Sequence, residues 1–116
     1  MKSILIVDDN KEIGEFLEDL FHIRGFEVVT CLAGEKAIEA GGSRRFDAAF
    51  VDIFLPGMDG VEVVERLNRL QPRMRIFLMS GYPTVEKVEK GLKVGAEAFL
   101  KKPFGVDEIL EMMKKD

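Results

Sequence analysis

The sequence predicts an α/β fold, (βα)5, in which five strands and five helices alternate around a doubly wound, five-stranded parallel sheet. Short apolar runs alternate with segments whose apolar residues recur at helical spacing. The runs are apolar at almost every position, which is typical of strands buried on both faces. Strict alternation of strand and helix favours parallel strands joined by right-handed crossovers. The 116 residues fit one domain, residues 1–116.

In the first half of the chain, residues 4–7 and 26–31 are the predicted strands. The helix between them begins after Asn10, a favourable cap, and ends at Gly25. The residues Ile13, Phe16, Leu17, Leu20 and Arg24 recur there at helical spacing, and the first four are apolar. A short helix over residues 35–40 follows, and Gly41-Gly42 is expected to end it.

The second half continues the alternation with three more strands, at residues 48–51, 76–79 and 98–100. A loop rich in Pro and Gly, residues 55–60, follows the first of these strands. Apolar spacing predicts two further helices, and a third is predicted where acids in the first turn and lysines in the last suit the helix dipole. They are marked by Val61, Val64, Leu67 and Leu70, by Val85, Val88 and Leu92 before Gly95, and by the segment 107–115.

Composition excludes several classes of protein. The single cysteine, Cys31, excludes an internal disulfide framework, and the single histidine, His22, excludes the usual His-rich metal sites. A net charge of -4 argues against nucleic acid as a direct partner. The longest apolar runs are about four residues, far short of the ~20 that span a membrane. Asp8 follows too soon for a signal peptide. We therefore expect a cytoplasmic, acidic domain.

Polar side chains follow the predicted strands at the points where the strands end. In open parallel sheets the ligand site lies beyond these carboxyl ends. The residues there are Asp8, Asp9, Cys31, Asp52, Ser80, Lys101 and Lys102. Three carboxylates, one hydroxyl and a lysine are therefore expected to meet at one edge of the sheet.

This set of side chains indicates a particular chemistry. Clustered carboxylates repel one another unless a cation lies among them, and an all-oxygen ligand set favours Mg²⁺ or Mn²⁺. A serine hydroxyl and a lysine ammonium opposite the acids suit a phosphoryl group. A carboxylate can itself accept phosphate. The residues thus predict Mg²⁺-assisted phosphoryl transfer to an aspartate.

Five segments together resemble a known family. They are Val-Asp-Asp-Asn at 7–10, Val-Asp-Ile-Phe-Leu-Pro-Gly-Met-Asp-Gly at 51–60, Met-Ser-Gly at 79–81, Gly-Ala at 95–96 and Lys-Pro-Phe at 102–104. In this order, and at these strand ends, they resemble the chemotaxis-type receiver domain of two-component response regulators over essentially the whole chain. The resemblance implies a flavodoxin-like sheet with strand order 2-1-3-4-5.

The resemblance also implies roles for the acidic residues. Asp52 would be the phosphoacceptor. Asp9 would bind Mg²⁺ directly, Asp8 would act mainly through a coordinated water, and the backbone carbonyl of Phe54 would complete the protein ligands. Mn²⁺ is an alternative ion.

Three further positions take roles from the same resemblance. Ser80 and Lys102 would contact phosphoryl oxygens, and the Lys102-Pro103 bond would be cis. Phe99 would be the aromatic switch residue. The family more often has Thr at the position of Ser80, and the serine keeps the hydroxyl. It frequently has Tyr at the position of Phe99, and the phenylalanine lacks the hydroxyl.

The implied function is signalling rather than enzymatic catalysis, since such a domain assists only its own phosphorylation and dephosphorylation. It would accept phosphate from a sensor histidine kinase or a histidine phosphotransfer domain. Phosphorylation would then switch the face made by the fourth helix, fifth strand and fifth helix, and so regulate an unidentified downstream effector. The expected state is a monomer or a weak phosphorylation-dependent dimer that binds neither nucleic acid nor a membrane.

Plainer interpretations apply to single residues. Asp8-Asp9 alone would suit a helix-capping turn. His22 is expected at the surface, and Phe99 also suits ordinary packing.

A flavodoxin would need a hydroxyl- and glycine-rich first loop, and a haloacid-dehalogenase-type phosphatase would need Asp-x-Asp-x-Thr; neither is present. A receiver that forms the input half of a longer regulator stays open, although the sequence favours a stand-alone receiver.

Overall fold

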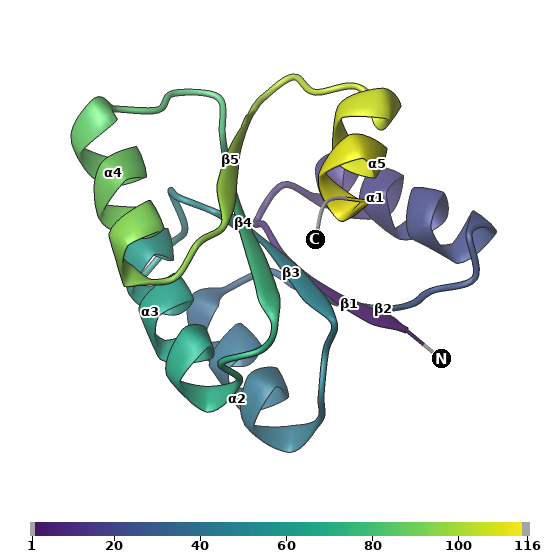
Figure 1. Cartoon of the computed structure of the whole chain (residues 1–116), viewed down its shortest axis with the longest axis horizontal. Helices are drawn as coiled ribbons and strands as arrows, with labels where there is room; N and C mark the ends of the chain where they lie inside the picture. Colours follow the sequence, from purple (N-terminus) through teal and green to yellow (C-terminus); the bar gives the residue numbers. More distant parts are fainter. Residues whose placement is uncertain (1, 115–116) are drawn as a thin grey trace.

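The structure, a computed structural model, describes residues 2–114 and contains five strands and five helices in strict alternation (Figure 1). The strands are β1 (Ser3–Val7), β2 (Glu27–Cys31), β3 (Ala48–Asp52), β4 (Arg75–Ser80) and β5 (Ala98–Lys101). The helices are α1 (Lys11–Ile23), α2 (Gly34–Ser43), α3 (Gly60–Leu70), α4 (Val85–Val94) and α5 (Val106–Lys114).

All strand pairs are parallel, in the order β2-β1-β3-β4-β5, so the predicted fold class and strand order are confirmed. Helices α1 and α5 cover one face of the sheet, and α2, α3 and α4 cover the other (Figure 1). The order places β1, β3 and β4 side by side at the centre of the sheet. The carboxyl ends of these three strands therefore lie next to one another.

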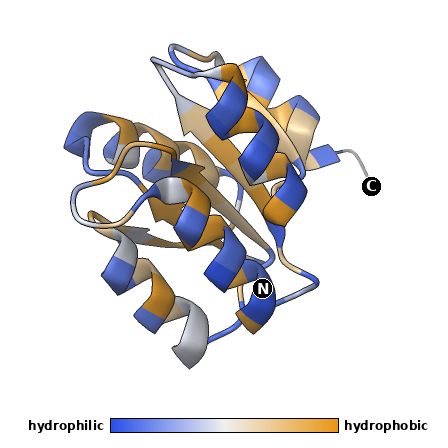
Figure 2. Cartoon of the chain, turned by 90° about the vertical axis from the view of Figure 1, so that its left-hand side faces the viewer, coloured by the Kyte–Doolittle hydropathy of each residue, from blue (hydrophilic) through white to orange (hydrophobic). Residues whose placement is uncertain are grey.

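Two cores form because successive strand side chains point to opposite faces. Ile4 and Ile6 belong to the core under α1 and α5, while Leu5 and Val7 belong to the core under the other three helices. All four side chains are fully buried. In Figure 2, hydrophobic and hydrophilic residues alternate along the helices, as expected for helices with one buried face. Within residues 2–114, no helix combines the length and apolar character needed to span a bilayer.

Aromatic rings form the centre of the core under α1 and α5. Phe50 of β3 stacks on Phe77 of β4 with ring centroids 5.0 Å apart, and lies 5.4 Å from Phe21 of α1. Each of these three rings is fully buried. They fix α1 and the central strands relative to one another, and hence the loop that follows β1.

The helix ends agree with the sequence in most places. Asn10 caps α1 by accepting the backbone N–H groups of Glu12 and Ile13. Gly25 and Gly95 adopt the positive φ angles, 88° and 141°, that favour glycine after a helix. Helix α5 ends at Lys114, and the predicted last residue, Lys115, lies outside the described residues.

The sequence-based expectations are wrong about the end of one helix and about the burial of four helix-marking residues, Phe16, Leu70, Val85 and Leu92, which are exposed. Helix α2 does not end at Gly41-Gly42 but continues to Ser43. A Cβ atom at Gly41 would lie 2.6 Å from Cδ2 of Leu67, so this glycine permits close packing of α2 on α3. On α1, Phe16 is 42% exposed, although its spacing predicts a place on the apolar stripe. The buried line on α1 runs through Gly14, Leu17 and Phe21, and Gly14 lies close to β2, since a Cβ atom there would be 3.1 Å from Cγ2 of Thr30.

Candidate phosphoryl and metal site

The candidate site lies at the carboxyl edge of the sheet, as the strand ends predicted. Asp8 and Asp9 follow β1, Asp52 is the last residue of β3, and Ser80 is the last residue of β4. Lys102 follows β5, and its backbone N–H donates to the carbonyl of Ser80 at 2.9 Å. Segments that are up to 94 residues apart in the chain therefore meet at one place.

Three carboxylates form a cluster at this edge. Asp8, Asp9 and Asp52 each offer an oxygen, and these oxygens all lie within 4.8 Å of one another. Asp8 is fully buried, Asp52 is 7% exposed, and Asp9 is exposed to solvent. The cluster could bind a metal ion, because it brings three carboxylate oxygens close together.

Lys102 joins the two buried carboxylates. Its Nζ donates to Oδ2 of Asp8 at 2.7 Å and to Oδ2 of Asp52 at 2.9 Å. The remaining oxygens accept backbone N–H groups, since Oδ1 of Asp8 accepts from Asn10 and Oδ1 of Asp52 accepts from Phe54. Each buried carboxylate thus has one bond to the ammonium and one to the backbone. The Lys102-Pro103 bond is cis.

Burial and charge act in opposite directions on the pKa values of this site. Burial raises the pKa of Asp52; the Lys102 hydrogen bond lowers it, and the Asp8 charge raises it further, so the net change is upward. For Lys102, burial lowers the pKa, but the hydrogen bonds to Asp8 and Asp52 outweigh burial, and the pKa is raised. Lys102 is therefore a firm positive charge at neutral pH, while the charged form of Asp52 is disfavoured.

The other predicted site residues lie around this cluster. Ser80 is 1% exposed, and its Oγ accepts the backbone N–H of Tyr82 at 3.0 Å rather than contacting an acid. The Phe54 side chain is 47% exposed, and Phe99 is partly buried against the core on the α4 side of the sheet. His22 is exposed on α1, as expected.

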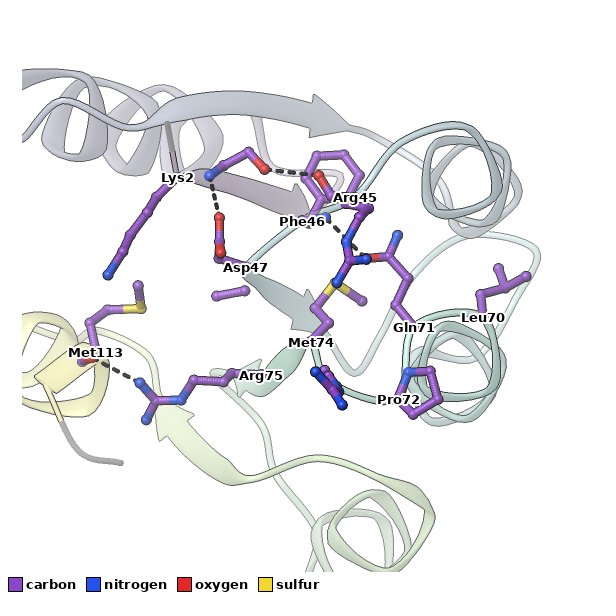
Figure 3. A pocket seen from close by; sticks show the side chains of 13 residues that line it. Lys2, Arg45, Phe46, Asp47, Leu70, Gln71, Pro72, Met74, Arg75 and Met113 are labelled. Atoms are coloured by element: carbon purple, nitrogen blue, oxygen red, sulfur yellow. Dashed lines mark hydrogen bonds between the residues drawn. The ribbon is translucent and has the colours of Figure 1, made fainter.

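A groove of about 900 Å³ lies at the opposite edge of the sheet, where the strands begin (Figure 3). Several of its polar side chains form hydrogen bonds that join elements of the fold. Oδ2 of Asp47 accepts the Ser3 N–H at 2.7 Å, and the Gln71 amide donates to two backbone carbonyls at the end of α2. The Arg75 guanidinium donates to Glu97 and to the carbonyl of Met113. The acidic edge, and not this groove, is the candidate functional site.

Sequence reasoning did not find the ion pairs that two lysines, Lys102 and Lys87, form near the site. It assigned Lys102 to a phosphoryl group and did not place it between Asp8 and Asp52. It also did not find the pair of Asp59, which caps α3, with Lys87 of α4. The Lys102 contact could have been predicted from the sequence, because a buried pair of acids needs a nearby cation. The contact between Asp59 and Lys87 depends on how α4 packs beside α3, and nothing in the sequence indicates it.

Comparisons with known proteins agree on one family. Residues 4–114 match the response regulator receiver domain. The chain is 31% identical over 114 residues to sporulation initiation phosphotransferase F of Bacillus subtilis, covering 98% of this chain and 92% of that protein. Several other curated relatives are longer, and the chain spans 28% to 48% of their length.

Solved structures give the same result. The receiver domain protein of Methanospirillum hungatei, described as CheY-like, has a TM-score of 0.95 and 32% identity over 98% of this chain and 91% of that one. A response regulator from Burkholderia pseudomallei has a TM-score of 0.93 and 29% identity over 99% of this chain and 68% of that one. That structure contains a phosphorylated aspartic acid, a calcium ion and citrate.

The raised pKa of Asp52 gives a test of the charge balance in the metal-free protein. Because the folded chain holds the Asp52 proton more tightly than the unfolded chain, stability falls as pH rises from the unfolded pKa through the folded one. Asparagine has no such proton. We expect Asp52→Asn to increase the free energy of unfolding at pH 7 in a chelator, and to add little near pH 3. Urea unfolding at both pH values measures this; a loss of stability at pH 7 would contradict it.

Proposed function

The chain belongs to the response regulator receiver domain family, and from this membership we propose that Asp52 accepts a phosphoryl group with Mg²⁺ bound beside it. Receiver domains of this kind accept phosphate from histidine kinases and pass the signal to a downstream output. The observation that carries the proposal is the cluster of Asp8, Asp9 and Asp52 with Lys102 at the carboxyl edge.

Three features support Asp52 as the acceptor. It ends the central strand β3, and its carboxylate is oriented by the Phe54 N–H at 3.0 Å and by the Lys102 ammonium. A carboxylate oxygen of Asp52 would attack phosphorus, and the P–N bond to the donor imidazole would break. The electron pair of that bond would leave with the imidazole. The phosphorylated aspartic acid of the Burkholderia relative is consistent with this chemistry.

The acidic cluster fits a hard divalent cation. Its ligands are carboxylate oxygens, with the Phe54 carbonyl proposed as an additional backbone ligand, and such oxygen-only sets suit Mg²⁺ or Mn²⁺. Asp9 is proposed as a direct ligand and Asp8 as acting mainly through a coordinated water. When bound, the ion would neutralise charge on the acids and on the incoming phosphoryl oxygens. Exposed Asp9 leaves the cluster open to solvent, from which an ion can enter.

Lys102 and Ser80 are proposed to hold the phosphoryl group. The Lys102 ammonium already lies 2.9 Å from Asp52 and would transfer a hydrogen bond from a carboxylate to a phosphoryl oxygen. The Ser80 oxygen accepts a bond from Tyr82, which leaves its O–H available as a donor. Phe99 on β5, partly buried beneath α4, is proposed as the residue that repacks when Ser80 moves.

The proposed signalling role extends these assignments to partners. The donor would be a sensor histidine kinase or a histidine phosphotransfer domain. The face formed by α4, β5 and α5 would contact the downstream effector, either as a monomer or as a weak phosphorylation-dependent dimer. We propose that residues 1–116 form a single receiver domain, located in the cytoplasm, that signals rather than catalysing a reaction on a separate substrate. Longer relatives include transcriptional regulators and a cyclic di-GMP phosphodiesterase.

Phosphorylation by a small donor tests the acceptor. We expect acetyl phosphate with Mg²⁺ to add one phosphoryl group to the wild type and none to Asp52→Asn, because the asparagine amide cannot replace the proposed nucleophilic carboxylate. Intact mass spectrometry with peptide mapping measures this. Asp47→Asn, at the opposite end of the sheet, is the matched control and should react like the wild type. An adduct that survives Asp52→Asn, or that maps to His22, would overturn the assignment.

Magnesium binding tests the ligands separately. At about one hundred times its dissociation constant, Mg²⁺ should add about 2.7 kcal/mol to the free energy of unfolding, because it binds only the folded cluster. Asp9→Asn should abolish this gain, while Asp19→Asn, an exposed acid on α1, should retain it. Urea unfolding with Mg²⁺ and with chelator measures the difference. A wild type that is indifferent to Mg²⁺ would show that the acids form no cation site.

A further inference from the structure

The first turn of α4 is held less closely than the rest of the helix. The one buried residue within α4 is Gly91, where a Cβ atom would lie 2.2 Å from Cδ1 of Leu78. Just past the helix, a Cβ atom at Gly95 would lie 2.7 Å from Cγ of Asn68 on α3. These close contacts seat the second half of α4 on β4 and α3. In the first turn, by contrast, Val85 is 74% exposed.

Val88 packs against the core in this first turn, and one ion pair joins the turn to the neighbouring helix α3. The Lys87 ammonium donates to Oδ2 of Asp59, the N-cap residue of α3, whose Oδ1 accepts the Val61 N–H at 2.8 Å. We call this contact the α3–α4 ion pair. The two side chains are 33% and 37% exposed. Within residues 2–114 it is the one side-chain hydrogen bond between residues 85–88 and another element.

The Asp59 end of the α3–α4 ion pair is fixed to the backbone of the candidate phosphoacceptor. Gly60 follows Asp59, and its N–H donates to the Ile53 carbonyl at 2.8 Å. A Cβ atom at Gly60 would lie 2.1 Å from the Asp52 carbonyl oxygen, so only glycine allows this approach. The start of α3 therefore cannot move independently of the end of β3.

The Lys87 end is linked to Ser80 by the loop over residues 81–84. This loop begins with the bond from the Tyr82 N–H to Ser80 Oγ and ends with Thr84, which accepts the Lys87 N–H at 3.2 Å. A displacement of Ser80 toward Asp52 would therefore be transmitted through the loop to Thr84 and Lys87. Those two residues form the turn that the α3–α4 ion pair holds.

We propose that the α3–α4 ion pair holds the first turn of α4, and with it the Ser80 loop, in the unphosphorylated position, so that Asp59 and Lys87 oppose phosphorylation. They act as positioning residues, because neither contacts the carboxylate cluster. The proposal rests on the proposed function, since it assumes that Ser80 moves toward a phosphoryl group on Asp52. Breaking the pair should shift the resting protein toward the phosphorylated conformation.

The affinity for beryllofluoride, a phosphoryl mimic, in the presence of Mg²⁺ tests the proposal. We expect Lys87→Gln to bind it about 2- to 5-fold more tightly than the wild type, the range for ion pairs of this exposure. Lys87→Arg keeps the charge and should bind as the wild type does. Lys93→Gln removes an exposed charge from the last turn of the same helix and is the matched control. Fluorine NMR titration measures all four proteins.

A second variant separates positioning from stability. Asp59→Asn keeps an N-cap side chain but loses the charge, so it should also tighten beryllofluoride binding, and the double variant should add little to either single one. Urea unfolding should show slightly lower stability for Lys87→Gln and for Asp59→Asn. A purely structural role of the ion pair would lower stability in the same way, but it would not tighten beryllofluoride binding. Unchanged or weaker binding by Lys87→Gln, or an equal gain in Lys93→Gln, would overturn the proposal. Failure of the wild type to bind would instead overturn the proposed function.

Discussion

Two buried carboxylates, Asp8 and Asp52, share a single ammonium group, that of Lys102, and the charge balance of the whole site depends on this contact. Removing two carboxylates from water costs several kcal/mol each unless a cation and hydrogen bonds compensate. Lys102 supplies the cation, and the N–H groups of Asn10 and Phe54 supply the remaining bonds. One positive charge beside three acids leaves the cluster with net negative charge, and a divalent ion suits such a cluster.

The topology of the sheet is enough to bring these residues together. Parallel strands end at the same edge, so residues placed at the end of β3 or directly after β1 and β5 meet there whatever their separation in the chain. Apolar side chains above and below the sheet hold the strands in register, and Gly60 lets α3 begin against the backbone of Asp52. The site is therefore built on rigid strand ends, while the segment beyond Ser80 is joined to them by few contacts. In the proposed function, a change of charge on Asp52 acts on that segment first.

Most of this architecture was predictable because it depends on local pattern. The strands are short apolar runs, and the pattern of residues at their ends is enough to place Asp8, Asp52 and Ser80 at one edge of the sheet. The errors arose where packing between elements overrides the local pattern. Gly41 resembles a helix end, yet it lies within α2 because α3 approaches closely there. Phe16 fits an apolar stripe, but the face of α1 that packs on the sheet carries Leu17 and Phe21, and Phe16 is left 42% exposed.

The affinity of the cluster for Mg²⁺ in a Lys102→Met variant tests most directly whether Lys102 is the resident counter-charge. If the ammonium neutralises Asp8 and Asp52 in the absence of metal, it also competes with a cation for them. Isothermal titration calorimetry should then show Mg²⁺ binding about tenfold tighter in Lys102→Met than in the wild type, since a nearby positive charge is removed. Circular dichroism would establish that the variant is folded. Equal or weaker Mg²⁺ binding in a folded variant would contradict the account.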